Sequence, residues 1–131
     1  MLRDINDNRN LTKTLGLCNR RPWRLLLMRR GDVWWAKLPK PMGQRPVVLV
    51  SRDEAYRIRT SVTVALVTTT IRHIRTEIPL GLEDGLPKLC VVNFDDLFTV
   101  EKSRLLQFIA HLSSEKMDMV DAAITFALAL S

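Results

Sequence analysis

The sequence predicts a small, mostly antiparallel β-sheet or barrel that packs against one C-terminal helix. After residue 28, most of the chain consists of short segments rich in β-branched and aliphatic residues, separated by turn-forming residues. The last segment instead has apolar residues at the three- and four-residue spacing of a helix. A chain of 131 residues suits a single domain that can bury a core without disulfides or metals. Strands followed by one helix are typical of the α+β class, here mainly β.

Residues 1–27 show neither a clean periodicity nor the apolar core of a signal peptide. They carry six basic and two acidic side chains, a net charge of +4. The stretch that begins at Met28, MRRGDVWW, reads like the start of a protein. We therefore interpret residues 1–27 as a flexible basic tail and residues 28–131 as the domain. We also hypothesise that the native protein begins at Met28, which the intact mass of the protein expressed from its own gene would test.

The first two strands are predicted at residues 32–38 (DVWWAKL) and 47–51 (VVLVS). The first alternates loosely and contains β-favouring valine and tryptophan, so one of Trp34 and Trp35 should face the core. Two prolines and a glycine within residues 39–43 then break it. The second is a continuous apolar run, which is typical of a strand covered on both faces.

Further β-rich segments follow a charged turn at residues 52–60. Strands are predicted at residues 61–69, 77–80, 89–94 and 97–100, with Asp95-Asp96 between the last two. Residues 105–112 (LLQFIAHL) fit either a strand or a helix, and periodicity does not decide between them.

The final segment is predicted to be a helix that begins after Ser113. Serine is a favoured N-cap, and Glu115 lies in the first turn, where the helix dipole favours a negative charge. The apolar residues of one face are Met117, Val120, Ile124, Ala127 and Leu128. This face should pack on the sheet.

Composition excludes several classes of protein. Hydrophobic residues make up 47% and charged residues 26% of the chain, the balance of a soluble globular protein. No apolar run approaches the roughly 18 residues that cross a bilayer, so no membrane association is expected. Cys18 and Cys90 lie far apart and match no metal-binding spacing. We expect a cytoplasmic protein with no disulfide, metal or cofactor.

Charge is distributed unevenly along the chain. Residues 28–75 hold ten basic and three acidic side chains (+7), whereas residues 76–131 hold four basic and nine acidic ones (−5). A basic surface attracts polyanions and makes their binding depend on salt. Charge alone does not separate a nucleic acid from an acidic protein as the partner.

Arg45 has an unusual position between a Gly-Gln turn and the proline that opens a buried strand. Pro46 favours an extended backbone at Arg45. If the strand at residues 47–51 and the strand at residues 61–69 are antiparallel neighbours, Thr68 lies near Arg45. A guanidinium and a hydroxyl at one rim suit phosphoryl chemistry, because both can donate hydrogen bonds to phosphate oxygens. The alternative is that both are ordinary surface residues at strand ends.

Five ordered blocks of the sequence resemble the MazF/PemK toxin family. They are RGDVWWAKL (30–38), GQRPVVLVSRDE (43–54), VALVTTT (64–70), LPKLCVVNFDDLFTVEKSRL (86–105) and HLSSEKMDMVDAAITFAL (111–128). The resemblance spans residues 28 to about 130. It implies an SH3-like antiparallel barrel with a C-terminal helix, the fold shared by MazF, PemK and CcdB-like toxins. It also implies a homodimer and a cognate antitoxin that binds across the RNA groove.

The implied activity is that of a toxin of a type II toxin–antitoxin system. Such a toxin would be a sequence-selective, metal-independent endoribonuclease that cleaves single-stranded RNA to 2′,3′-cyclic phosphate and 5′-hydroxyl ends, which inhibits translation and growth. By the resemblance, Arg45 matches the family's catalytic arginine and Thr68 its catalytic threonine. Residues predicted to bind RNA are Lys40, Gln44, Thr69, Thr70, His73 and Asp96.

The sequence departs from the family in places that relatives use to read bases or to dimerise. The segment at residues 39–44 (PKPMGQ) is short and has no carboxylate, and residues 95–99 read DDLFT where relatives often have EQIRT. The general base and the cleavage motif are therefore not implied. Two rival functions remain open: a toxin of the same fold directed at DNA gyrase, and a non-catalytic RNA-binding module.

Overall fold

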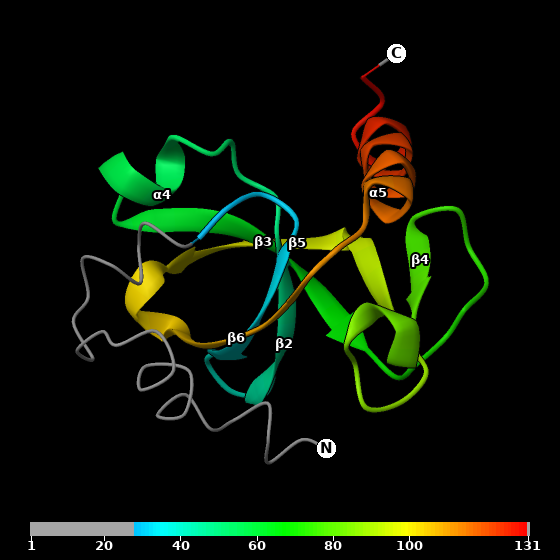
Figure 1. The fold of residues 1–131 in the computed structure, drawn as a ribbon, viewed down its shortest axis with the longest axis horizontal. Helices are drawn as coiled ribbons and strands as arrows, with labels where there is room; N and C mark the ends of the chain where they lie inside the picture. The colour runs from blue at the N-terminus through cyan, green and yellow to red at the C-terminus, as the bar shows by residue number, and fades with distance from the viewer. Residues whose placement is uncertain (1–27, 131) are drawn as a thin grey trace.

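Residues 28–130 are described by a computed structural model, in which a curled antiparallel sheet carries a long helix against one face (Figure 1). The described strands are β1 (Asp32–Lys37), β2 (Gln44–Leu49), β3 (Ser61–Thr68), β4 (Glu77–Leu80), β5 (Cys90–Glu101) and β6 (Leu105–His111). They form one sheet in the order β4-β5-β3-β2-β1-β6. The prediction for residues 1–27 falls outside the described residues.

Helical turns connect several of the strands. A short helix, α4 (Ala55–Ile58), joins β2 to β3, and the 3₁₀ turns η1 (Leu82–Asp84) and η2 (Lys102–Arg104) flank β5. The long helix α5 (Ser114–Ala127) follows β6. Its N-cap is Ser113, whose hydroxyl accepts a hydrogen bond from the backbone of Lys116 at 3.2 Å, as the sequence predicts.

Several predicted elements differ from the observed ones, and the charged turn predicted at residues 52–60 contains the helix α4. The second strand begins at Gln44 rather than at residue 47, because residues 44–46 pair with β1. The segments at residues 89–94 and 97–100 belong to one long strand, β5, which passes through an irregularity in its pairing with β3 between Leu66 and Ala65. The ambiguous segment at residues 105–112 is a strand because β1 offers it a free edge.

Alternating side chains build one core on each face of the sheet. The inner face of the curl buries Trp34, Val47, Leu49, Tyr56 and Leu66, among others. The outer face buries Val33, Val48, Val67 and Leu86 beneath α5. Thus Trp34 belongs to the core, as one of the two tryptophans was expected to.

The helix α5 packs on the outer face through Val120 and Ala123, which are its buried residues. Met117, Ile124 and Ala127 are partly buried against the same core, as predicted. Leu128 was predicted on this face, but it is 52% exposed. The reason is that α5 ends at Ala127, so Leu128 no longer follows the helical spacing.

Candidate functional site

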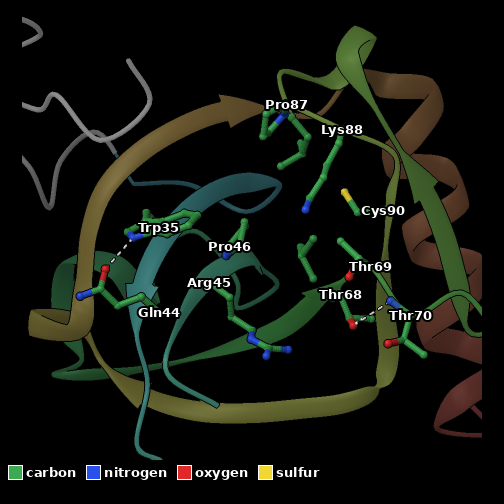
Figure 2. Close-up of a pocket in the computed structure, with 12 residues that line it drawn as sticks. Trp35, Gln44, Arg45, Pro46, Thr68, Thr69, Thr70, Pro87, Lys88 and Cys90 are labelled. Atoms are coloured by element: carbon green, nitrogen blue, oxygen red, sulfur yellow. Dashed lines mark hydrogen bonds between the residues drawn. The ribbon is translucent and has the colours of Figure 1, made fainter. Parts of the chain in front are cut away.

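A cavity of about 340 Å³ lies at one end of the sheet, where β2 begins and β3 ends (Figure 2). Its walls come from β1, β2, residues 67–70 and residues 86–90, so it joins segments that are far apart in the sequence. We call it the sheet-end cavity. Its size falls within the range of sites that bind small ligands or single groups of a larger one.

Strands β2 and β3 stop pairing at this point because of Pro46. The ladder between β2 and β3 has Val48 opposite Ala65 and ends with Val47 opposite Leu66. Val50 donates its backbone N–H to Thr63 in β3, so strand alternation also points the nitrogen of Pro46 at β3. Proline has no N–H to donate, and the ladder stops there. Pro46 therefore ends the β2–β3 ladder next to the opening between the strand ends.

Arg45 lies at this opening and is half-buried. Its backbone is held in β2 by pairing with Ala36 of β1. Its Nε atom donates a hydrogen bond to the carbonyl oxygen of Met42 at 3.1 Å. This bond fixes one edge of the guanidinium and leaves its terminal nitrogens available to a ligand, with no ion pair to any carboxylate among residues 28–130.

Thr68 is the last residue of β3 and lines the same cavity. Its Oγ1 atom accepts a hydrogen bond from the backbone N–H of Thr70 at 3.1 Å. A hydroxyl group has one proton to donate, and here the oxygen is engaged as an acceptor within the turn. The proton is thus free to point at a ligand in the cavity.

Arg45 and Thr68 line the same cavity from neighbouring strands. Continuing the β2–β3 register two positions beyond Val47 and Leu66 places Arg45 opposite Thr68. Because side chains alternate along a strand, both project from the inner face, to which Val47 and Leu66 also belong. Figure 2 shows the guanidinium of Arg45 and the hydroxyl of Thr68 directed into the same space.

The opposite face of the same strands supplies an aromatic and apolar floor. Trp35 in β1 is the cross-strand partner of Pro46, and both line the cavity. The indole Nε1 of Trp35 donates a hydrogen bond to Oε1 of Gln44 at 3.0 Å. Its polar edge is therefore satisfied within the protein, and its half-exposed ring can serve as a stacking surface.

The remaining wall is the segment that leads into β5. Leu86 is buried, and Lys88 is exposed, with its ammonium directed into the cavity (Figure 2). Cys90 is buried behind it. Burial raises the pKa of the Cys90 thiol, and the charge of Asp84 raises it further against the opposing effect of Lys88. Cys90 therefore stays a neutral thiol near pH 7 and is a wall residue rather than a nucleophile.

The sheet-end cavity contains five of the predicted site residues: Gln44, Arg45, Thr68, Thr69 and Thr70. Lys40, His73 and Asp96 do not line it. Lys40 is exposed in the turn between β1 and β2, and Asp96 is half-buried at the irregularity in β5. Their roles in RNA binding stay predictions.

His73 lies in a loop that does not line the sheet-end cavity. Glu77 accepts hydrogen bonds from the backbone N–H groups of Arg72 and His73 at 2.9 and 3.1 Å. These bonds hold the loop, in which His73 has a left-handed backbone with φ of 57°. His73 lines a second cavity with Arg75, Asp95 and other residues near the end of α5.

Sequence reasoning missed Lys88 and the wall around it. A usable signal was present, since Lys88 lies two residues before the buried start of β5, as Arg45 lies two residues before the apolar run at residues 47–51. His111 has a structural role, because its Nδ1 lies 2.8 Å from Oδ1 of the buried Asp32. Among residues 28–130, no group of three or more histidine, cysteine or acidic side chains is arranged to hold a metal ion.

The fold and the cavity define a class of protein: a curled β-sheet that presents a fixed cation, hydroxyl donors and an aromatic surface at its end. Comparison with known families identifies it further. Residues 29–128 match the model of the PemK-like, MazF-like toxins of type II toxin–antitoxin systems. The chain belongs to this family.

Curated relatives agree with this membership. The chain is 40% identical over 92 residues to the probable endoribonuclease MazF2 of Mycobacterium tuberculosis, covering 69% of this chain and 87% of the relative. It is 31% identical over 113 residues to the endoribonuclease EndoA of Bacillus subtilis, covering 80% of this chain and 97% of the relative. The prediction that the chain is an enzyme of the endoribonuclease class is thus confirmed.

Solved structures confirm the predicted fold. A mycobacterial endoribonuclease in complex with its cognate antitoxin matches with a TM-score of 0.71 and 29% identity, covering 79% of this chain and 97% of that one. The Mycobacterium tuberculosis toxin MazF-mt6 also matches with a TM-score of 0.71, at 31% identity, covering 76% and 98%. No helix within residues 28–130 is long and apolar enough to span a membrane.

Proposed function

We propose that this toxin cleaves single-stranded RNA at the sheet-end cavity by a metal-independent transesterification in which Arg45 and Thr68 grip the reacting phosphodiester. The observation that carries the proposal is the register of β2 and β3, which puts the two side chains on one face at the mouth of one cavity. Family membership supports the RNA substrate, because curated relatives are endoribonucleases by name.

The chemistry requires an internal nucleophile and stabilisation of negative charge. The ribose 2′-oxygen loses its proton and attacks phosphorus, the bond from phosphorus to the 5′-oxygen breaks, and the 5′-oxygen gains a proton. The products are a 2′,3′-cyclic phosphate and a 5′-hydroxyl. During the attack, negative charge grows on the non-bridging oxygens, where the guanidinium of Arg45 and the hydroxyl of Thr68 donate hydrogen bonds.

The walls of the cavity supply contacts on either side of the reacting group. Trp35 offers a ring on which a base can stack, and Gln44 holds that ring in place through the bond to its Nε1. Thr69 and Thr70 add hydroxyls at the end of β3. Lys40, His73 and Asp96 would contact nucleotides farther along the strand.

The partners also follow from the family. One solved relative is a mycobacterial endoribonuclease in complex with its cognate antitoxin, and we propose that an acidic antitoxin segment occupies the sheet-end cavity and excludes RNA. Adding the antitoxin should then suppress cleavage and RNA binding together, and a ternary complex with full cleavage would contradict this. A homodimer, which light scattering would measure, and a cytoplasmic location stay predictions.

The central experiment incubates purified protein with single-stranded RNA in excess chelator and repeats the assay with Arg45→Ala. We expect cleavage to survive the chelator and to fall by about a hundredfold or more in the variant, as for the loss of an oxyanion donor. Arg57→Ala is the matched control, because Arg57 is an exposed arginine on α4. It should cleave like the wild type.

The outcomes separate the three functions. RNA binding without cleavage in the wild type would favour a binding module, and inhibition of gyrase without any effect on RNA would favour the gyrase-directed toxin. Cleavage that stops in chelator would contradict the metal-independent mechanism. Mapping the ends of the product would test the chemistry directly, because hydrolysis to a 3′-hydroxyl excludes attack by the 2′-oxygen.

A further inference from the structure

The ammonium group of Lys88 takes no part in the proposed contacts to the reacting phosphodiester. It lines the sheet-end cavity, and Figure 2 shows its side chain crossing from the far wall toward the interior. No hydrogen bond or ion pair joins its ammonium to another residue within 28–130. A cation that points into a cavity without an internal partner is suited to an anionic ligand.

The segment that carries Lys88 is fixed by the fold. The backbone N–H of Leu86 donates to the carbonyl of Gly81 at 3.1 Å, and the Leu86 side chain is only 1% exposed. Asp84 accepts a hydrogen bond from the backbone of Gly81 at 3.0 Å, which closes the η1 turn. On the other side, Cys90 begins β5 within the core. Lys88 is thus held between two buried anchors.

Lys88 and the Arg45–Thr68 pair approach the cavity from different sides of the sheet. Arg45 and Thr68 project from the inner face, as shown by their alternation with Val47 and Leu66. Lys88 extends over the outer face, to which Leu86, Cys90 and Val67 belong. An extended strand that passes over the end of the sheet would therefore meet Arg45 and Lys88 at different phosphates.

We propose that Lys88 is a positioning residue that binds a phosphate flanking the scissile one and so holds the RNA in register with Arg45 and Thr68. This inference rests on the proposed function. A lysine ammonium acts here as a point charge, with three donors and little geometric demand. Its contribution should therefore appear in binding and in the dependence of binding on salt.

The test compares wild type, Lys88→Met, Lys88→Arg and Arg57→Met. Methionine keeps an unbranched stem without charge, arginine restores the charge, and Arg57→Met removes one charge from α4, which does not contribute to the cavity. The ligand is the RNA that the wild type cleaves, made non-cleavable by a 2′-deoxy sugar at the cleaved linkage. For Lys88→Met we expect Kd to rise about tenfold, as for one charge-assisted contact. The slope of log K against log salt should fall by about 0.7, the value for one phosphate contact on a single strand.

A neutral methylphosphonate, placed at each flanking linkage in turn, locates the contact. At one linkage it should weaken binding to the wild type about tenfold and leave binding to Lys88→Met unchanged. Lys88→Arg should behave like the wild type, and so should Arg57→Met. Equal weakening of wild type and Lys88→Met at every linkage, or an unchanged salt slope, would overturn the inference.

The failure of this inference is distinguishable from the failure of the proposed function. If the wild type cleaves RNA in an Arg45-dependent way while Lys88→Met binds and cleaves normally, only the role of Lys88 is refuted. If the wild type neither binds nor cleaves RNA, both fall together. Melting temperatures of the variants show whether a loss comes from unfolding, and because Lys88 is exposed they should stay near that of the wild type.

Discussion

Two requirements on Arg45 usually conflict: its backbone must pair within strand β2, and its charged side chain must reach a ligand. The conflict is resolved because the next residue is a proline that ends pairing with β3, while pairing of Arg45 with β1 continues. The bond from Nε to Met42 then reduces the rotational freedom of the guanidinium. A donor that is already oriented costs less entropy when it binds a phosphate, which is why such a position suits catalysis.

Thr68 is the residue for which the hydroxyl itself can be tested. Thr68→Val keeps the shape and removes the donor, so we predict that kcat falls by about a hundredfold. Thr68→Ser keeps the hydroxyl and should retain most of the activity. Single-turnover cleavage assays measure both. A valine variant with wild-type kcat would show that the Thr68 proton does not contact the reacting group.

Adjacent tryptophans should respond in opposite ways, because they lie on opposite faces of β1. Trp34 is 3% exposed, packs edge-on against Phe108 with ring centroids 6.1 Å apart, and donates to Asp32. Trp34→Ala should lower the free energy of unfolding by about 3–5 kcal/mol. Trp35→Ala should leave stability nearly unchanged and weaken RNA binding by about 1–3 kcal/mol, the value of one stacked base.

Chemical denaturation and RNA titration of both variants check this contrast. Trp35→Phe keeps an aromatic ring and serves as the control for stacking. If Trp35→Ala binds RNA as tightly as the wild type, the ring is not a stacking surface. If Trp35→Ala instead unfolds at a much lower denaturant concentration, Trp35 is a structural residue.

At the scale of elements, the loop from η1 to β5 is what places a wall opposite the strand ends. Its turn depends on Gly85, which has a φ of 90° and would bring an added Cβ within 2.7 Å of the Cβ of Ala110. A left-handed backbone is accessible to glycine at little cost, and the close approach leaves no room for a side chain. The position of Lys88 and Leu86 therefore depends on a glycine three residues before Lys88.

Gly85→Ala should destabilise the fold by more than the roughly 1–2 kcal/mol of backbone strain alone, because of the added clash. The matched control is Gly43→Ala, where φ is 67° and no atom lies within 4 Å of the added Cβ. It should cost only the strain, about 1–2 kcal/mol. Urea unfolding of the two variants gives the comparison. Equal losses would mean that the contact with Ala110 relaxes freely.

At the scale of the whole molecule, charge is distributed unevenly between two parts of the chain. Residues 28–75, which include β1, β2 and β3, carry a net +7, whereas residues 76–131 carry −5. The two parts interleave in the sheet, because β5 and β6 pair with β3 and β1. Under the proposed function, the cations at the strand ends, Arg45 and Lys88, attract RNA to the cavity.

RNA binding should consequently weaken steeply with salt. The slope of log K against log salt should equal about −0.7 for each phosphate contacted, so three contacts would give a slope of about −2. Fluorescence titrations between low and high salt, with a non-cleavable RNA, measure the slope. A slope near zero would show that the basic surface does not contact the phosphates.

Most of the fold could be predicted from the sequence. Strand positions, the turn chemistry and the N-cap at Ser113 follow from local propensity and capping, which depend on nearby residues only. The placement of Arg45 near Thr68 also followed, because antiparallel pairing of two strands of known length leaves little freedom in register. The local pattern did not decide the structure of residues 105–112, because their spacing of apolar residues fits both a helix and a strand. Pairing with β1 makes this segment a strand.

By itself, the sequence determined which residues can carry charge and where strands begin and end, since these depend on side-chain chemistry and local backbone preference. Only the tertiary structure decided that Trp35 and Lys88 share a cavity with Arg45, and that His73 and Asp96 do not line it. The physical reason is that a cavity forms at the place where the contacts between separate elements end. That depends on the register and curl of the whole sheet, which no short segment encodes.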